Sequence, residues 1–577
     1  MRSSQLRGAL LIMLSWATCV MGYIIHVPRD YATIQAGIET AIDGDTVLVA
    51  PGDYYESLRL REKTIVLGSW FIISGDKGYI SRTILHGGDS TIIRVNRGVG
   101  PATTISGFTL KDGRDGINPR ARINILYNHI ISCVDGIDYE RGSGGICSNN
   151  VIEDNEGEGL DLNGEVDIVI EDNVIRNNKE DGIEITLLDY AGPLVNHVIR
   201  RNFIYGNRQD GIQLVDYPGL SQRVIRIERN VIFDNGFSGI GLMGNGKDKE
   251  NYEGADVEEP IYLIHNTIFG NNYGMTGGDR VFAINNLFGA NQTTAMRKVD
   301  GHSIVAHSNL WLNGTDFDSC NVDQATLTFD IPLLDENYFP TMGGSCFDGG
   351  ATFFAWQGNT VLNATPDSYS GAAPDIGAFE SVALFEPLPA EITCIPSPGQ
   401  VELVWRSADA DNSLGFEILR SQDGIRMSRV AFVESQPSMT PSGEPGEHRY
   451  VDSGLLHSVY YYRLMQNKNG RASLSSVCRT EVTAPEAYGL PPNYPNPFNG
   501  ETTIKFDLPT AGQVTLKIYN SLAQEVRTLV DEERPAGYHR LTWDGRDGSG
   551  SLVASGVYFY QLRAVNYKAT RALTLIH

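Results

Sequence analysis

Polar and apolar positions repeat along the middle of the chain in one short phrase. The phrase is Asn-x-Ile-x-x-Asn-x-x-x-Gly-Ile, with small variations from copy to copy. In complete copies the second asparagine follows the first by five residues, whereas successive copies begin 20 to 36 residues apart. One corner of each repeat is therefore fixed and another accepts insertions, as in a solenoid. Copies begin at Asn150, Asn173, Asn202, Asn230, Asn266 and Asn286, and an incomplete copy with Cys133 as its second polar position begins at Asn128.

This repeat predicts a parallel β-helix, because its period is in the low twenties and its apolar residues alternate in short β segments. Each rung of such a helix stacks about 4.8 Å from the next. An asparagine at a fixed corner can then bond to the equivalent asparagine one rung along, and we expect glycine to supply the bend. Leucine-rich repeats share the period, but the Leu-x-x-Leu-x-Leu frame is missing here.

The chain resembles the secreted right-handed parallel β-helix proteins of the pectate-lyase-like superfamily over about 23–380. Its opening, Ile25-His-Val-Pro-Arg-Asp-Tyr-Ala-Thr-Ile-Gln-Ala-Gly-Ile, and its closing Pro374-Asp-Ile-Gly-Ala-Phe-Glu380 carry the likeness together with the repeat. The resemblance implies a capping helix at roughly Ile34 to Ile42. The superfamily contains lyases, hydrolases, esterases, epimerases and non-enzymes, so the likeness implies a fold and leaves the activity open.

Two shorter domains are predicted after the repeat, each preceded by a Pro-rich stretch. Residues 384–484 alternate as sandwich strands and resemble a fibronectin type III domain. Residues 488–577 closely resemble the C-terminal sorting domain of type IX secretion cargo, also called a FlgD-like immunoglobulin domain. That likeness implies export across the outer membrane, with the domain contacting secretion machinery or a cell-surface attachment. The predicted fold class is all-β, a right-handed parallel β-helix followed by two small β-sandwich domains.

The N-terminus predicts a signal peptide over residues 1–22. Arg2 and Arg7 precede an apolar run, Ala9 to Trp16, that is too short to span a bilayer. No later segment reaches transmembrane length, so we expect a secreted protein or one on the outer cell surface. The net charge of −24 argues against nucleic acid as a partner, because phosphates require a basic surface.

Six cysteines remain after the predicted signal peptide, an even number that suggests three disulfides in an exported protein. Fifteen pairings are open to six cysteines. Proximity in the sequence favours Cys133–Cys147, Cys320–Cys346 and Cys394–Cys478.

One column of outward-facing residues is unusually acidic. The residue after each Gly-Ile pair should point outward, because strand side chains alternate. Three carboxylates in neighbouring rungs would repel each other by roughly 1 kcal/mol per neighbour in water and about 3 kcal/mol at an effective dielectric of 20. Another face instead alternates in sign through Glu171, Arg200 and Glu228. In order, the acidic column reads Asn118, Asp138, Asp161, Glu184, Gln213 and Gly241.

Two chemical uses fit Asp138, Asp161 and Glu184, the candidate catalytic and metal-binding residues. Carboxylates at this spacing can hold Ca²⁺, which could bridge an acidic sugar. A crowded pair can instead raise one pKa and create an acid/base couple for glycoside hydrolysis. The structural alternative is a solvated surface on which the side chains fan apart. For a lyase, Arg141 and Lys179 are the nearest basic candidates in the sequence.

Long insertions follow this column and supply candidate substrate-binding residues. Loops beside one face of a rigid solenoid commonly form binding sites, and tyrosine rings can stack on sugars. Ordinary turn formation explains the residues of these insertions equally well. A second acidic set, Asp115, Asp135, Glu158, Asp181 and Asp210, precedes glycines and is interpreted mainly as turn residues. The candidate substrate-binding residues are Asp189, Tyr190, Gln213, Asp216 and Tyr217.

The sequence therefore favours an exported, surface-associated β-helix protein that binds or processes polysaccharide, as a calcium-assisted lyase or a carboxylate hydrolase. The alternative is a non-catalytic adhesive or surface structural protein, with the helix serving as a stiff rod. The acidic column separates these hypotheses. Loops that converge on it to form a cleft favour binding or catalysis, whereas an open, flat column favours the rod.

Overall fold

The structure is a computed structural model that describes residues 22–219, 221–244, 255–335, 337–381, 386–387, 392–407, 415–424, 427–434, 446–468 and 471–576. The predicted signal peptide lies outside the described residues except for its last position. The chain forms two compact units. The first comprises residues up to 329 with 350–365 and 376–378, and the second comprises the remainder. Among the described residues, no helix is long and apolar enough to cross a membrane.

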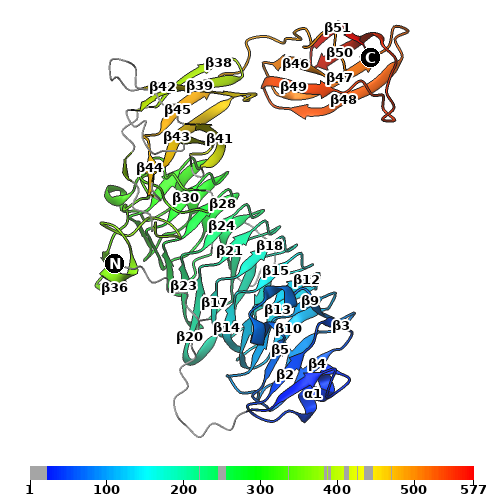
Figure 1. Ribbon diagram of the computed structural model, residues 1–577. Helices are drawn as coiled ribbons and strands as arrows, with labels where there is room; N and C mark the ends of the chain where they lie inside the picture. The colour runs from blue at the N-terminus through cyan, green and yellow to red at the C-terminus, as the bar shows by residue number, and fades with distance from the viewer. Residues whose placement is uncertain are drawn as a thin grey trace. The chain divides into compact units, whose positions relative to one another are not determined.

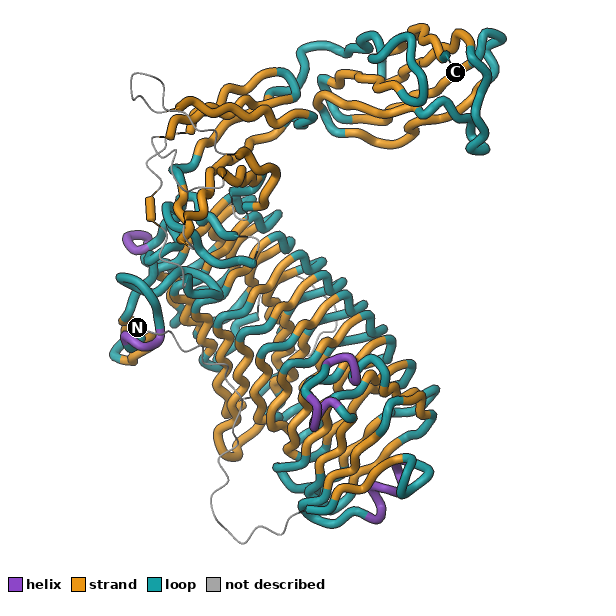
Figure 2. Tube along the Cα trace, in the orientation of Figure 1, coloured by secondary structure: helices purple, strands orange, loops and turns teal. Residues whose placement is uncertain are grey.

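Three long parallel sheets, A, B and C, form the walls of the first unit (Figures 1 and 2). Each turn of the chain adds one strand to each sheet, which confirms the predicted right-handed parallel β-helix. Sheet A contains β1 (Ile24–Val27), β2 (Thr46–Val49), β5 (Val66–Ser69), β8 (Thr104–Ser106), β11 (Arg122–Leu126), β14 (Gly144–Ser148), β17 (Asp167–Glu171), β20 (Tyr190–Arg200), β23 (Ser221–Glu228), β26 (Ile261–Ile264), β29 (Val281–Ile284) and β32 (Ile304–Ala306).

Sheets B and C follow the same order along the axis, with eleven strands each. Sheet B contains β3 (Gly52–Tyr54), β6 (Thr83–His86), β9 (Thr109–Lys111), β12 (His129–Ile131), β15 (Val151–Glu153), β18 (Val174–Arg176), β21 (Phe203–Tyr205), β24 (Val231–Phe233), β27 (Thr267–Phe269), β30 (Leu287–Gly289) and β33 (Asn309–Trp311). Sheet C contains β4 (Leu58–Leu60), β7 (Ile93–Val95), β10 (Asp115–Pro119), β13 (Asp135–Tyr139), β16 (Leu160–Leu162), β19 (Ile183–Leu187), β22 (Ile212–Asp216), β25 (Ser238–Met243), β28 (Tyr273–Thr276), β31 (Thr294–Arg297) and β34 (Thr315–Asp318).

The two asparagines of the repeat form two buried ladders, as the sequence predicts. At the corner between sheets A and B, Asn150 donates from Nδ2 to Oδ1 of Asn173 at 3.0 Å, and the bond recurs rung by rung. At the corner between sheets B and C, Asn155 bonds to Asn178 in the same way at 2.9 Å. Each Oδ1 also accepts a backbone N–H from the preceding rung, such as that of Asn150 at 2.9 Å. The ladders therefore satisfy corner amides that no strand can pair.

The repeated glycine is required by space, which corrects the expectation that it supplies the bend. A Cβ on Gly182 would lie 2.5 Å from the carbonyl oxygen of Gly211 in the next rung. The bend between sheets A and B instead uses a non-glycine residue of positive φ before each ladder asparagine, such as Arg201 at 55°. The glycine lets the start of each sheet C strand lie close to its neighbour.

A short helix covers the N-terminal end of the coil, as the resemblance implies. It is α1 (Ile34–Thr40), with Thr33 as its N-cap residue. The carboxylate of Glu56 accepts the first two helical N–H groups, from Ile34 at 2.9 Å and Gln35 at 3.0 Å. This carboxylate satisfies donors that a helix start leaves open. A second helix, α2 (Phe71–Ser74), follows β5.

At the C-terminal end of the coil, an antiparallel hairpin covers part of the outer surface of sheet A. The hairpin is β35 (Phe353–Trp356) and β36 (Asn359–Asn363). Its apolar side chains pack on those that the last strands of sheet A direct outward, such as Phe282 and Ile304. This cover explains why sheet A is apolar on both faces there.

The second unit contains two sets of small antiparallel sheets. In the range predicted to be fibronectin type III-like, they comprise β37 (Glu386–Pro387), β38 (Ile392–Ser397), β39 (Gln400–Ser407), β40 (Gly415–Ser421), β41 (Ser428–Glu434), β42 (Gly446–Ser453), β43 (Ser458–Lys468), β44 (Arg471–Leu474) and β45 (Cys478–Val482). The last set comprises β46 (Thr502–Leu508), β47 (Gly512–Tyr519), β48 (Glu525–Arg534), β49 (Gly537–Trp543), β50 (Gly556–Ala564) and β51 (Tyr567–Leu575). Each set packs around its own apolar core. The first core contains Trp405 and the second contains Trp543.

One of the three suggested disulfides is formed. Cys394 on β38 bonds to Cys478 on β45. The suggested Cys133–Cys147 and Cys320–Cys346 bridges are wrong, because all four of these cysteines are free. Cys133 and Cys147 are close in sequence but occupy different walls of one turn of the coil, Cys133 after the sheet B strand and Cys147 within sheet A. In a solenoid, proximity along the chain does not give proximity in space.

Candidate functional site

The predicted acidic column lies in register on sheet C. Asp138 pairs with Asp161 across β13 and β16, Asp161 with Glu184 across β16 and β19, and Glu184 with Gln213 across β19 and β22. Residues on either side of the column, such as Ile183, are fully buried in the coil. Neighbouring strands are about 4.8 Å apart, so the outward side chains stand as a closely spaced row.

Two asparagines connect the carboxylates of this row. The Nδ2 group of Asn163 donates to Asp138 at 3.2 Å and to Asp161 at 2.5 Å. The Nδ2 group of Asn118, which is only 1% exposed, donates to Asp138 at 2.8 Å. A single amide therefore spans Asp138 and Asp161 and fixes them beside each other. Sequence reasoning placed Asn118 in the column and missed Asn163, which lies two residues beyond Asp161 on the same strand side.

The environment separates the two carboxylates chemically. Burial, followed by the charges of Asp115 and Glu140, raises the pKa of Asp138 to about 6. Burial, followed by the charges of Glu184 and Asp138, raises the pKa of Asp161 to about 8. At neutral pH Asp138 is therefore mostly ionised and Asp161 mostly protonated. Neighbouring carboxyl groups with separated pKa values are the pattern of an acid/base couple.

A second acidic column stands beside the first, at the residues interpreted from the sequence as turn residues. Asp210 and Asp181 do have a turn role, since Oδ1 of Asp181 accepts the N–H of Asp210 at 2.6 Å. Burial also raises the pKa of Asp135 and of Glu158, and in Glu158 a hydrogen bond to Glu180 adds to the effect. The turn interpretation is therefore incomplete, because the carboxyl groups of these residues also add to the acidic surface of sheet C.

The best arranged cation ligands come from both columns. Glu158, Asp181 and Glu184 each offer one oxygen, and these three oxygens lie within 4.8 Å of one another. Carboxylate oxygens are the ligands that Ca²⁺ prefers, and a cation there would offset their repulsion. Of the predicted metal ligands, only Glu184 belongs to this group. Glu158 and Asp181 lie next to it because the glycine after each one lets neighbouring rungs approach closely.

At its N-terminal end, the column that contains Asn118 and Asp138 continues into arginines. Arg59 pairs with Arg94 across β4 and β7, and Arg94 pairs with Asn118. A hollow of about 220 Å³ is lined by both arginines and by Arg114. Arg94 donates from Nη2 to Thr91 at 3.1 Å. Two guanidinium groups in register form a place where an anionic group can bind in a chain that is strongly acidic overall.

The predicted substrate-binding residues are split by the structure. Gln213 stands in the column, and Asp216 ends the same strand three residues later, roughly 10 Å away. Tyr217 follows Asp216. In the turn of the preceding rung, Asp189 directly precedes β20 and Tyr190 begins it. These four residues therefore line the corner between sheets C and A. Burial, followed by the charges of Glu259 and Glu258, raises the pKa of Asp216 to about 6.

The two basic candidates for a lyase are held in ion pairs. Arg141 makes two bonds to the carboxylate of Glu165, each at 2.5 Å. Lys179 is paired with Glu156 on the exposed surface. In contrast to sheet C, the outer face of sheet A alternates in sign as predicted, with Arg200 bonded to Glu171 at 2.7 Å.

Two family models match parts of the chain. The right-handed beta helix region matches residues 71–216, and the FlgD Ig-like domain matches residues 493–568. No curated protein matches the sequence. The matched helix region contains the acidic column from Asn118 to Gln213, together with the arginine end at Arg94.

Several solved structures are similar at low identity. The A-module of mannuronan C-5 epimerase from Azotobacter vinelandii is 16% identical over 52% of this chain and 96% of its own, with a TM-score of 0.36. The catalytic unit of an α-1,3-glucanase from Streptomyces thermodiastaticus is 12% identical over 51% and 64%, with a TM-score of 0.28. The enzymatically active domain of tailspike protein 2 from bacteriophage CBA120 is 10% identical over 95% and 83%, with a TM-score of 0.31. The family match and the sheet topology together identify a right-handed parallel β-helix in the first unit, and residues 493–568 of the second unit are similar to a FlgD Ig-like domain.

Proposed function

We propose that this is an exported protein that binds and cleaves a polysaccharide along the outer surface of sheet C. The observation that carries the proposal is the pair Asp138 and Asp161, held together by Asn163 with pKa values near 6 and 8. A row of outward polar groups, one per rung from Arg59 to Gln213, suits an extended polymer, because successive sugar units can each meet a polar side chain.

The two carboxyl groups have complementary roles in glycoside hydrolysis. Protonated Asp161 donates its proton to the oxygen of the leaving sugar as the glycosidic bond breaks. Ionised Asp138 then accepts a proton from the attacking water, or attacks the sugar carbon itself. Asn163 keeps both groups oriented. Activity should therefore rise with ionisation of Asp138 near pH 6 and fall with deprotonation of Asp161 near pH 8.

The surroundings of the pair suit a substrate that carries anionic groups. Arg59 and Arg94 lie two or three rungs from Asp138 in the same column, where they can bind a carboxylate or sulfate of the polymer. A Ca²⁺ ion would be held by Glu158, Asp181 and Glu184, and it would supply a positive charge that can bind a second acidic group of the polymer.

Export and surface attachment are part of the proposal. The match of residues 493–568 to the FlgD Ig-like domain supports a C-terminal module that contacts secretion machinery or a cell-surface attachment. The disulfide between Cys394 and Cys478 is consistent with an oxidising compartment outside the cytoplasm.

The proposal is tested by incubating the full mature chain with a panel of neutral and acidic polysaccharides, with calcium and with a chelator. New reducing ends without ultraviolet absorbance mean hydrolysis, and absorbance from unsaturated products means a lyase. We expect reducing ends, and we expect Asp161→Asn to lower their rate by at least about 100-fold. The matched control is Asp167→Asn on the outer face of sheet A, which breaks only a half-exposed ion pair with Arg122. Unchanged turnover in Asp161→Asn would remove the pair from the reaction.

A non-catalytic adhesive role is the second candidate. The FlgD Ig-like match favours it as much as it favours a surface enzyme, since both need attachment. No turnover across the panel, combined with binding that Arg94→Gln weakens, would establish this role.

A further inference from the structure

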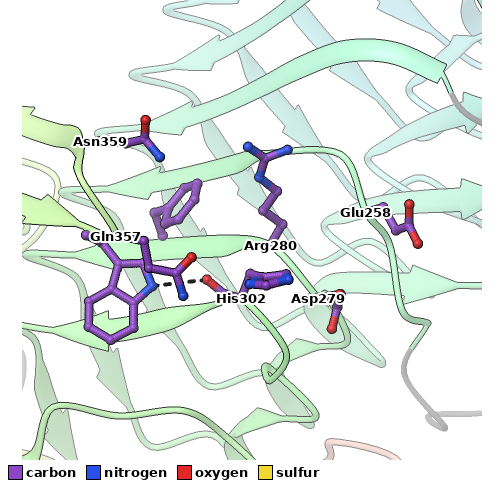
Figure 3. A pocket seen from close by; sticks show the side chains of 8 residues that line it. Glu258, Asp279, Arg280, His302, Gln357 and Asn359 are labelled. Atoms are coloured by element: carbon purple, nitrogen blue, oxygen red, sulfur yellow. Dashed lines mark hydrogen bonds between the residues drawn. The ribbon is translucent and has the colours of Figure 1, made fainter.

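A second hollow, of about 400 Å³, lies on a different wall of the first unit, where the β35–β36 hairpin meets the edge of sheet A. One side is formed by three successive turns that lead into sheet A, and the other by the hairpin tip. Figure 3 shows Arg280, His302 and Asp279 grouped on one side, with Gln357 and Asn359 opposite. The lining residues are Glu258, Asp279, Arg280, Phe282, His302, Trp356, Gln357 and Asn359.

The hairpin holds this hollow in a fixed shape. Gln357 and Gly358, with φ of 47° and 83°, form a two-residue turn that returns the chain directly beside Trp356. The indole Nε1 of Trp356 donates to the carbonyl oxygen of His302 at 3.2 Å (Figure 3). Trp356 also packs against the apolar cluster that contains Phe282. The indole is thus anchored at its polar edge and along its apolar body, so a ligand need not order it.

Three polar side chains around the indole of Trp356 are accessible to a ligand. Arg280, Gln357 and Asn359 are all exposed. Within the part of the chain that the structure describes, Arg280 forms no ion pair, although Glu258 and Asp279 line the same hollow. Guanidinium, amide and carboxylate groups offer paired donors and acceptors, the arrangement that neighbouring sugar hydroxyls require.

We infer that this hollow binds a neutral pyranose unit of a glycan and forms a carbohydrate-binding site separate from sheet C. A pyranose ring has an apolar C–H face that can lie on the indole of Trp356 and a rim of hydroxyls that can meet Arg280 and Asn359. A neutral sugar is favoured over an anionic one because two carboxylates, Glu258 and Asp279, face one guanidinium. Such a site would attach the protein to a glycan while the acidic column works elsewhere.

The test is affinity electrophoresis of the full mature chain in gels that contain dextran, laminarin, mannan, xylan or polygalacturonate. We expect at least one neutral polymer to retard the protein. Trp356→Ala should weaken that binding by about tenfold or more, as for an aromatic anchor that a bound ligand covers. Arg280→Met and Asn359→Ala should weaken it by several-fold. These two side chains are exposed, so their variants remain informative even if Trp356→Ala fails to fold.

Two controls separate this site from the rest of the molecule. Phe353→Ala changes the same hairpin at a side chain that is 57% exposed and does not line the hollow, so its retardation should be unchanged. Asp167→Asn should also be retarded normally, because its half-exposed ion pair with Arg122 lies several rungs from the hollow and outside the sheet C column. Retardation that survives all three hollow variants, its absence in every neutral gel, or retardation by polygalacturonate alone would each overturn the inference.

Discussion

Replacing Asp161 by asparagine should stabilise the folded protein at pH 8, although it removes the proposed catalytic acid. The pKa of Asp161 is about 8 in the folded chain, against an ordinary value of 3.8. Between these pH values the folded protein keeps a proton that the unfolded chain releases. Raising the pH therefore favours unfolding, and this loss of stability begins near pH 4 and is complete near pH 8. Asparagine carries no charge, and its side-chain oxygen can still accept the Asn163 bond.

The size of the effect follows from the pKa values. A change from 3.8 to about 8 corresponds to roughly 6 kcal/mol, since each pKa unit is about 1.4 kcal/mol. Asp161 is partly exposed, so solvent and relaxation reduce this figure, and we expect about 3 kcal/mol. For a unit of this size, 1 kcal/mol moves the melting temperature by about 2 °C, which gives a relative shift of roughly 6 °C between pH 4 and pH 8.

The assay is thermal unfolding of wild type and Asp161→Asn from pH 4 to pH 9, at one scan rate and with chelator to remove bound cations. The wild-type melting temperature should fall with pH, and the variant should fall less. Asp167→Asn serves as the control, because its ion pair with Arg122 lies on sheet A, and it should follow the wild-type slope. Parallel curves for wild type and Asp161→Asn would refute the claim that folding raises the pKa of Asp161.

Three further predictions concern the ladder, the cation ligands and the disulfide. Asn178→Ala should lower the free energy of unfolding by about 3–5 kcal/mol in denaturant titrations, because it leaves the backbone and side-chain N–H groups of Asn155 unpaired; a loss under 1 kcal/mol would contradict the ladder's role. Calcium should raise the melting temperature at pH 7, and Glu158→Gln should at least halve that rise; equal rises would exclude Glu158 as a ligand. Cys394→Ser should destabilise the sandwich that carries it by about 4 kcal/mol, since the bridge closes a loop of 84 residues, and reduced wild type should then match the variant.

The fold could be predicted because every repeat carries, at fixed positions, the asparagines that constrain it most strongly. Each asparagine ladder needs the same residue at the same corner, and Asn150, Asn173 and Asn202 therefore recur with fixed spacing to their partners. Hydrophobic alternation then decides which side chains enter the coil, and this placed Asp138 and Asp161 outside correctly. The bend between sheets A and B was harder to predict, because Arg201 adopts a positive φ although it is not a glycine.

The candidate site was predictable only along one column. Register within sheet C follows from the repeat, so the neighbours of Glu184 above and below could be read directly from the sequence. The residues that lie beside the column could not be predicted in this way, because their positions depend on how the corner between two sheets packs. Glu158 and Asp181 come beside Glu184 through the close approach of glycines. Asn163 reaches two carboxylates from the position that directly follows β16. The hollow at Trp356 depends on a hairpin that follows the last rung, which no repeat pattern describes.

The two faces of the coil show why the acidity of sheet C points to function. Both sheets stack side chains at the same spacing, and on sheet A the charges alternate so that Arg200 neutralises Glu171. On sheet C the same backbone carries carboxylates in successive rungs, and their folded state must hold protons at pH values where free carboxylates are ionised. Alternating signs would have removed that cost without altering the coil, since outward side chains do not enter the core. The carboxylates of sheet C and their energetic cost are best explained by what binds to this surface. The bound species is either a proton that is transferred in the reaction or a cation that takes the place of that proton.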